Sequence, residues 1–273
     1  MRDYEIEDFL GKGSYGVVIR ARRKGRCYAI KALIKDERNS GILPFQLESE
    51  ILRRIAHPRV PGFVEAFTAG DVHYIVQEHI DGLPLSSILD IGRRFHEAEV
   101  KGIVLQLLSI LNGLHRPAQK ENAVIHRDVR LSNLLLKDKQ VFLIDFGYAR
   151  FLDPAQFVFC PDPLQYKFSA AVGSEKRAPE KVKELPSLKK IPGPETYKLL
   201  RREISPRSDL FGVGVAAVDL FTTWVEDESQ FELSWQEVLP LSGQFIVFLQ
   251  KLLSQKDGFS SAREALACLE SIL

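Results

Sequence analysis

The spacing of apolar residues predicts strands and one helix in the first eighty residues. Between residues 45 and 56 apolar side chains recur every three or four positions, which predicts an amphipathic helix. His57-Pro58 follows, and the residue before a proline disfavours helical backbone. Four stretches with strand-like patterns are predicted at 9–20, where glycines interrupt the run, and at 27–34, 62–68 and 72–80.

From residue 81 onward the pattern is mainly helical. Residues 97–114 form a long amphipathic helix, and residues 210–221 form an apolar one, followed by weaker helices. Two short strands, 134–136 and 141–144, enclose a polar turn. The chain is therefore predicted to be an α+β protein with a small β-rich lobe over residues 1–80 and a larger, mostly helical lobe over 81–273.

Composition narrows the class of protein. The 273 residues are 45% hydrophobic and 27% charged, and 37 Lys and Arg nearly balance 36 Asp and Glu. This balance is typical of a folded globular chain and gives no charge excess for nucleic acid or a membrane surface. The three cysteines lie far apart in the sequence, which argues against a disulfide framework or a zinc site. The longest apolar run, 210–218, is about half of a membrane span. We expect a cytoplasmic protein with no membrane or nucleic-acid partner.

Three glycines, Gly11, Gly13 and Gly16, form a G-x-G-x-x-G-x-V pattern between two predicted strands. Glycines let a hairpin pass close to phosphate groups and point backbone N–H groups at them. The pattern alone is weak, because glycines in a β-turn usually mark only a turn. A dinucleotide-binding fold would need a helix next, whereas Val17-Val18-Ile19 predicts a strand.

Lys31 ends the alternating run Tyr28-Ala29-Ile30-Lys31. An edge-strand lysine that faces solvent is the ordinary interpretation. A functional lysine needs a carboxylate partner, and Glu48 on the following helix is the preferred candidate, with Glu50 as the competitor.

The strongest cluster is His126-Arg127-Asp128-Val129-Arg130-Leu131-Ser132-Asn133, followed by Asp145-Phe146-Gly147. Carboxylate and amide oxygens are the protein ligands that Mg²⁺ accepts beside phosphates. An isolated loop aspartate is more often a turn residue. These polar groups in this order, after the glycines and Lys31, are hard to explain as turns.

Taken together, the motifs resemble those of eukaryotic-type serine/threonine protein kinases. The resemblance runs from about residue 4 to about residue 269, and it includes Ala178-Pro179-Glu180 near the middle. It implies a two-lobed kinase fold, ATP and Mg²⁺ as cofactors, and a protein substrate with a serine or threonine acceptor.

The resemblance also implies roles for single residues. The three glycines would cover the ATP phosphates, and Lys31, paired with Glu48, would contact them. Asp145 and Asn133 would hold Mg²⁺, and Asp128 would accept or orient the proton of the acceptor hydroxyl. The adenine site would be formed by the connecting residues Gln77, Glu78 and Ile80 and by Val18, Ala29 and Leu135.

Several positions depart from the family pattern. Arg130 occupies the position where serine/threonine kinases usually carry lysine. Arginine keeps the positive charge and can bind phosphate. Some tyrosine kinases also carry arginine at this position. Phe259 aligns with the arginine that normally pairs with Glu180, so that ion pair is expected to be missing or to be replaced by Arg263. No threonine lies between Asp145 and Glu180, which leaves Ser169, Ser174, Tyr148 and Tyr166 as the hydroxyls there.

Two alternatives remain open from the sequence. The segment Gly173-Ser174-Glu175-Lys176-Arg177 departs from the peptide-docking pattern, which keeps a small-molecule phosphotransferase of the same architecture possible. A pseudokinase scaffold is the other, although it would be expected to lose Lys31, Asp128, Asn133 or Asp145. The basic segment 181–207 is either a solvated loop or a dock for an acidic substrate.

Overall fold

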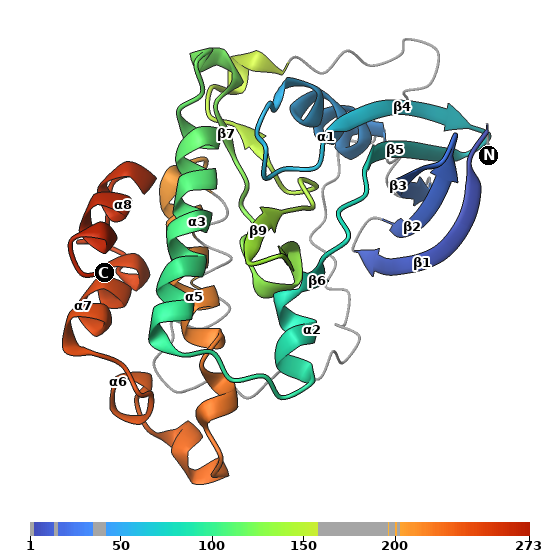
Figure 1. Cartoon of the computed structure of the whole chain (residues 1–273). Coiled ribbons are helices and arrows are strands. Elements are labelled where there is room, and N and C mark those ends of the chain that lie inside the picture. The colour runs from blue at the N-terminus through green and yellow to red at the C-terminus, as the bar shows by residue number, and fades with distance from the viewer. Residues whose placement is uncertain (1–2, 14–15, 35–41, 158–195, 197–199, 201–202) are drawn as a thin grey trace, which may run out of the picture.

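The computed structural model describes residues 3–13, 16–34, 42–157, 196, 200 and 203–273. Figure 1 shows the strands β1–β5 with helix α1 at one end of the molecule and the helices α6–α8 at the other, with α3 and α5 between them. This arrangement, a sheet-based lobe and a helical lobe, confirms the predicted bilobal α+β fold.

The sheet-based lobe holds one five-stranded antiparallel sheet in the order β1-β2-β3-β5-β4. Its strands are β1 (Glu5–Gly13), β2 (Gly16–Arg23), β3 (Arg26–Ile34), β4 (Phe63–Ala69) and β5 (Val72–Glu78). The predicted stretch 9–20 therefore belongs to two strands, and the first begins earlier, at Glu5. The hydrophobic pattern did not indicate this start, because β1 is an edge strand with irregular register. Its residues Ile6 and Phe9 are largely exposed.

The two faces of the sheet serve different purposes. Ile30 on the middle strand β3 packs on one face with Ala21, Val76 and Phe67 in a small apolar cluster. The opposite face, where Lys31 lies, is covered by α1 (Ile42–Arg54), whose apolar side is buried in the main core. The alternation of side chains along a strand thus separates a structural face from a face that is free to line a site.

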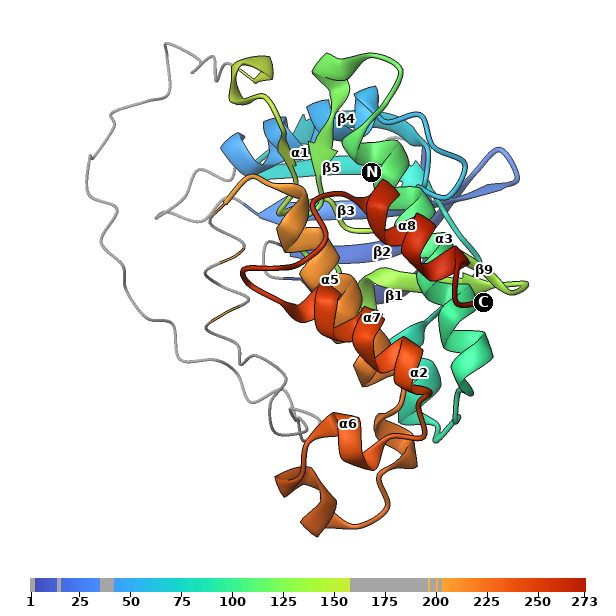
Figure 2. The same ribbon diagram turned by 90° about the vertical axis from the view of Figure 1, so that its left-hand side faces the viewer.

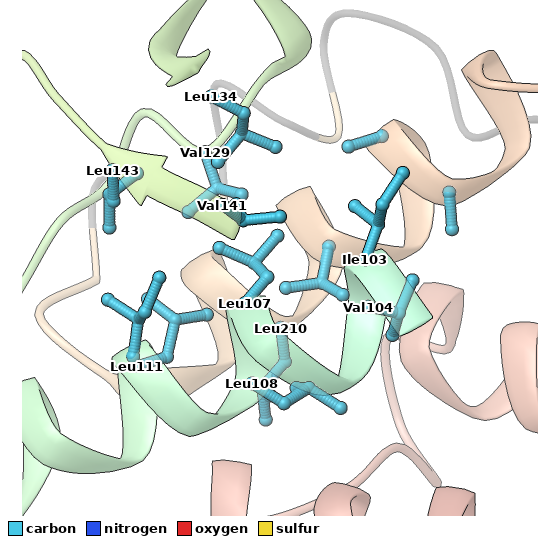
Figure 3. Close-up of a cluster of buried hydrophobic side chains, with 14 of the residues drawn as sticks. Ile103, Val104, Leu107, Leu108, Leu111, Val129, Leu134, Val141, Leu143 and Leu210 are labelled. Atoms are coloured by element: carbon cyan, nitrogen blue, oxygen red, sulfur yellow. The ribbon is translucent and has the colours of Figure 1, made fainter. Parts of the chain in front are cut away.

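The helical lobe is built around two long helices, α3 (Glu97–His115) and α5 (Pro206–Asp219). Figure 3 shows Leu107 and Leu111 of α3 with Val141 and Leu210 in the shared apolar core. Figure 2 shows α7 beside both α5 and α8. In the described part of the chain the other helices with given bounds are α2 (Leu85–Asp90), α6 (Trp235–Val238), α7 (Gly243–Leu253) and α8 (Ala262–Glu270). Within the described ranges, no helix is both long and apolar enough to cross a bilayer.

Short strands lie between the sheet and the long helices, and they carry the loops of the site. They are β6 (Leu83–Pro84), β8 (Leu134–Lys137) and β9 (Gln140–Leu143) in one small sheet, and β7 (Val124–Ile125) with β10 (Arg150–Phe151) in another. Single 3₁₀ turns cover Lys120–Asn122, Leu131–Asn133, Pro154–Gln156, Thr222–Trp224 and Glu228–Glu232. Helix α2 was not predicted, because six residues offer too few repeats for helical spacing to be recognised.

Several sequence features lie outside the described residues. These are the motif 178–180, the segment 173–177, the hydroxyls of Ser169, Ser174 and Tyr166, Cys160 and most of the basic segment 181–207.

Candidate active site

A cavity of about 480 Å³ lies between the inner face of the sheet and the short strands of the helical lobe. Most of the residues predicted for the site line it together. They are Gly11, Val18, Ala29, Lys31, Glu48, Gln77, Glu78, Ile80, Arg130, Asn133, Leu135 and Asp145. Its wall also contains residues that the sequence did not single out, among them Lys12, Pro84, Ser86, Ser87 and Ser132.

Two predicted residues, Asp128 and Gly16, are not part of the cavity wall that the described residues form. Asp128 lies behind it and is hydrogen-bonded to Asn133, which is on the wall. Gly13 ends β1 and Gly16 begins β2, and residues 14–15 between them are not described. At Gly16 a Cβ would lie 2.0 Å from the carbonyl oxygen of Ala32, so only glycine fits between the strands.

A second hollow of about 870 Å³ shares the wall formed by Glu78, His79 and Ile80. It is larger, but apart from Glu78 and Ile80 it is lined by none of the predicted site residues. Its other side chains include Arg20 and Cys27 of the β2–β3 hairpin. The smaller cavity is therefore the one that gathers the reactive groups.

At the inner end of the cavity one ammonium is held by two carboxylates. Lys31 Nζ donates to Glu48 Oε1 and Oε2 at 2.8 and 2.9 Å and to Asp145 Oδ1 at 2.8 Å. Only 9% of Lys31 and 2% of Glu48 is exposed. Because β3 lies between β2 and β5, Lys31 is not an edge-strand lysine. Glu50, the competing carboxylate, instead forms ion pairs with Arg53 and Arg54 on its own helix.

The three groups change one another's protonation. Burial lowers the pKa of Lys31, but attraction to Glu48 and Asp145 outweighs it, so the net pKa is raised. Burial raises the pKa of Asp145, but Lys31 and the N–H of Gly147 bring it below its ordinary value. For Glu48 burial prevails and the pKa is raised. Lys31 therefore stays charged at neutral pH, and Asp145 stays ionised.

The backbone around Asp145 is shaped to hold this cluster. Asp145 has a φ of 62°, and the N–H of Gly147 donates to its Oδ1 at 3.3 Å. A Cβ on residue 147 would lie 3.0 Å from Lys31 Nζ and 3.2 Å from Asp145 Oδ1. Gly147 is therefore needed because a larger residue would push into the ion cluster.

Asp128 is fixed by its neighbours in the loop that follows β7. Asn133 Nδ2 donates to the backbone oxygen and to Oδ2 of Asp128, both at 2.9 Å. Arg130 Nε lies 3.3 Å from the same Oδ2. Only 1% of Asp128 is exposed, whereas 54% of the Arg130 side chain is. The carboxylate is thus oriented from one side by an amide and from the other by a guanidinium.

This loop is anchored by Asp209, which lies near the start of α5. Its carboxylate accepts from the backbone N–H groups of His126 and Arg127 at 2.8 and 2.6 Å and contacts His115 Nε2 at 2.8 Å. Arg127 has a φ of 66°. Burial raises the pKa of Asp209, but its hydrogen bond and attraction to His115 bring the net pKa below the ordinary value. This role was not predicted from the sequence; its signal there is an acid within the apolar helix α5, where a buried charge requires internal donors.

The far end of the cavity is formed by the segment that joins the lobes. The N–H of Glu78 donates to Gly62 O at 2.9 Å, and Gln77 Nε2 donates to Pro61 O at 3.3 Å, so both residues are tied to the loop before β4. Val18 and Ala29 line the cavity from the sheet and Leu135 lines it from β8. A flat, mostly apolar group can fit between these walls.

The oxygen atoms near Lys31 fit a hard cation. Asp145 carries an ionised carboxylate, and both amide hydrogen bonds of Asn133 use Nδ2, which leaves its Oδ1 as an acceptor. Mg²⁺ prefers a few such oxygens together with phosphate and water. Among the described residues no group of three or more His, Cys, Asp or Glu has metal-binding geometry. The donor set therefore suits a cation that shares its ligands with a phosphorylated substrate.

Comparison with known proteins agrees with this geometry. The protein kinase domain family matches residues 4–254. The chain belongs to this family. Human NUAK family SNF1-like kinase 1 is 33% identical over 186 residues, which cover 65% of this chain and 27% of that protein.

Two further relatives match the chain with similar identity. The probable serine/threonine-protein kinase YbdM of Bacillus subtilis (strain 168) is 32% identical over 161 residues, which cover 56% of this chain and 60% of that protein. Cell division control protein 2 homolog 3 of Trypanosoma brucei brucei is 34% identical over 151 residues, 54% of this chain and 47% of that protein. The chain matches less than two thirds of the length of each of these relatives.

The departure at Phe259 has a structural explanation. Phe259 is buried and packs on Phe248, with ring centroids 5.4 Å apart. Arg207, at the start of α5, donates to Ser254 O at 3.1 Å and so ties α5 to the end of α7. Arg263 is exposed on α8. The position thus contributes to the apolar core; Glu180 itself lies outside the described residues, so its pairing with Arg263 stays a prediction.

Proposed function

We propose that the chain is an ATP-dependent protein kinase that transfers the γ-phosphate of ATP to a serine or threonine hydroxyl of a protein. The observation that carries this proposal is the contact of Lys31 with both Glu48 and Asp145 at 2.8 Å, inside the cavity that Asn133 and Arg130 also line. Membership of the protein kinase domain family supports it.

In this proposal the nucleotide lies along the length of the cavity. Its adenine would pack between Val18 and Ala29 above and Leu135 below, and pair with backbone groups of Glu78 and Ile80. Its phosphates would then lie at the inner end beneath the glycines of β1 and β2. The Lys31 ammonium, kept charged by its raised pKa, would contact them.

Asp145 and Asn133 would hold Mg²⁺, which supplies neutralisation of phosphate charge when bound. Asp128 would orient the acceptor hydroxyl and take its proton, since Asn133 and Arg130 fix its carboxylate next to the cavity. Arg130 keeps a positive charge at this point and can contact the transferred phosphate. Positioning and charge stabilisation would thus supply most of the rate.

The choice of serine or threonine rests on the relatives. YbdM is described as a probable serine/threonine-protein kinase, and its similarity covers 56% of this chain. We extend that acceptor preference to this chain as part of the proposal. Acid stability of the phosphoamino acid formed would distinguish these acceptors from tyrosine.

The experiment is transfer from labelled ATP with Mg²⁺ to protein by the full chain and its variants. We expect Asp128→Asn and Asp145→Asn to lower transfer by about 10²–10⁴-fold, the range that a proton-transferring or charge-stabilising group supplies. Asp138→Asn is the matched control, because Asp138 is exposed in the β8–β9 turn, away from the cavity. Its φ of 49° also suits asparagine.

Other results would contradict the proposal. Label found only on a small metabolite would indicate a small-molecule phosphotransferase. ATP binding without turnover by the wild type would indicate a scaffold. Equal transfer by the wild type and Asp128→Asn would remove Asp128 from the chemistry.

A further inference from the structure

The two ends of the cavity differ in which charges are accessible. At the inner end the carboxylates of Glu48 and Asp145 are engaged by Lys31. We call the part of the cavity wall that Lys12 and Arg130 line the mouth; both side chains are cations. Lys12 is exposed on β1, and 54% of the Arg130 side chain is exposed. Both line the same cavity, one from the sheet and one from the loop beside Asp128.

The cations at the mouth keep much of their charge available. Within the described part of the chain, no carboxylate lies within ion-pair distance of Lys12. Arg130 Nε lies 3.3 Å from Asp128 Oδ2. A guanidinium carries further N–H donors, and the exposure of this one leaves them open to solvent.

The acids that could cancel these cations are directed elsewhere. Asp128 is 1% exposed and hydrogen-bonded to Asn133. Glu78 lies at the opposite, hinge end of the cavity, where its Oε2 accepts from the N–H of Gly62 at 3.2 Å. The cavity wall also contains the uncharged side chains of Pro84, Ser86, Ser87 and Ser132.

We propose that the substrate segment of this enzyme carries Asp or Glu beside its acceptor hydroxyl, an inference that rests on the proposed kinase function. To reach Asp128 the acceptor must enter through the mouth, between Lys12 and Arg130. Acidic residues on either side of the hydroxyl pair with these cations, whereas lysine or arginine there is repelled. The serines of the cavity wall add hydrogen-bond donors for carboxylates.

The test uses three peptides of equal length with one central serine, flanked by aspartates, by lysines or by neutral residues. Binding to the full chain is measured by fluorescence anisotropy with a non-hydrolysable ATP analogue and Mg²⁺, and phosphorylation is measured separately with ATP. We expect the aspartate peptide to bind about two- to fivefold more tightly than the neutral one for each pair formed, the factor typical of exposed ion pairs. The preference should decrease as salt is raised.

Lys12→Glu should remove or reverse the preference, and Lys256→Glu should leave it unchanged. Lys256 is an exposed lysine after α7 that lines none of the cavities, so it controls for the change in net charge. The ATP concentration dependence is measured with each peptide. If Lys12 served the nucleotide instead, Lys12→Glu would raise the KM for ATP equally with all peptides and leave their ranking intact, which would overturn the inference.

The remaining outcomes distinguish the preference for acidic segments from the kinase function. Phosphorylation of all peptides with equal binding, or with tighter binding of the lysine peptide, overturns the acidic preference and leaves the kinase function standing. Lys12-dependent binding of the aspartate peptide without phosphorylation of any peptide supports the preference for acidic segments and contradicts the kinase function. Absence of both binding and phosphorylation overturns both.

Discussion

The two polar clusters of the site are built in opposite ways. The Lys31 cluster joins β3, α1 and the loop after β9, so its members are 17 and 114 residues apart in the chain. The Asp128 cluster is local, since Asn133 lies five residues away, and the loop is fixed from below by Asp209. The first cluster depends on how the lobes pack against each other, and the second depends on the backbone of one loop. Substitutions should therefore affect them differently.

The largest effect is expected from Lys31→Met. We expect phosphoryl transfer to fall by about 100-fold or more, because a positive charge at the phosphates is lost. Stability should fall by about 3 kcal/mol, because Glu48 is left buried without its cation. Activity assays and denaturant unfolding of the purified variant measure both.

The double variant Lys31→Met with Glu48→Leu sharpens this test. Apolar residues can replace a buried ion pair without loss of stability, so we expect stability to recover while activity stays low. Recovery of activity in the double variant would show that the ion cluster only holds the lobes together.

Asp209→Asn tests the local cluster. An amide has only one acceptor oxygen for the donors from His126, Arg127 and His115, so we expect a loss of about 3 kcal/mol in unfolding free energy. Activity should fall because the loop that carries Asp128 loses its anchor. Stability unchanged within about 0.5 kcal/mol, the ordinary range for surface substitutions, would contradict the anchoring role.

Substitutions at Gly16 and Gly11 distinguish a glycine that is needed for steric reasons from one that is needed only for nucleotide binding. A Cβ at Gly16 would lie 2.0 Å from Ala32 O, whereas a Cβ at Gly11 would meet nothing within 4 Å. We expect Gly16→Ala to cost about 1–3 kcal/mol, as overpacked sites do. Gly11→Ala should change stability by less than about 0.5 kcal/mol and act only through the KM for ATP. Thermal unfolding of the two variants gives the comparison directly, and equal melting temperatures would contradict it.

The smallest effect concerns the other end of α5. Asp219 is partly buried, and burial raises its pKa from 3.8 to about 6. Between these values the folded chain binds more protons than the unfolded one, so stability should fall as pH rises through this window. The loss should be at most about 2 kcal/mol, since the side chain keeps some contact with solvent.

Asp219→Asn should remove this decline, because the amide does not titrate. Asp209 acts with the opposite sign: its lowered pKa contributes stability above pH 3.8 that is lost at lower pH. Unfolding free energies of the wild type and Asp219→Asn between pH 4 and 7 are the measurement. Identical profiles for the two proteins would contradict the pKa shift of Asp219.

Helices and strands were predicted correctly where the spacing of apolar residues in the sequence matches the side chains that are buried. Helix α3 was predicted almost to the residue, because one face of its nineteen residues is buried in the core. The start of β1 was missed, since Ile6 and Phe9 face solvent at a sheet edge. Helix α5 was predicted to begin at Leu210, but Pro206 starts it, as proline suits the first helical turn.

For the site, motif residues were predictable and supporting residues were not. Lys31, Asp128 and Asn133 belong to a recognisable order along the chain. Asp209 and Lys12 do not, because their importance comes from contacts and exposure that only the folded chain creates. Gly147 likewise needs the positions of Lys31 and Asp145 before its lack of a side chain has a reason.

The proposed nucleotide and metal sites lie in the cavity of about 480 Å³, with the Asp128 carboxylate behind its wall, although a larger hollow of about 870 Å³ lies across the hinge residues. A crystal structure with Mg²⁺ and a non-hydrolysable ATP analogue tests this placement most directly. We predict adenine between Ala29 and Leu135, with the phosphates and metal at Lys31 and Asp145. A nucleotide bound in the larger hollow beside Arg20 and Cys27, with the Lys31 cluster unoccupied, would contradict the account.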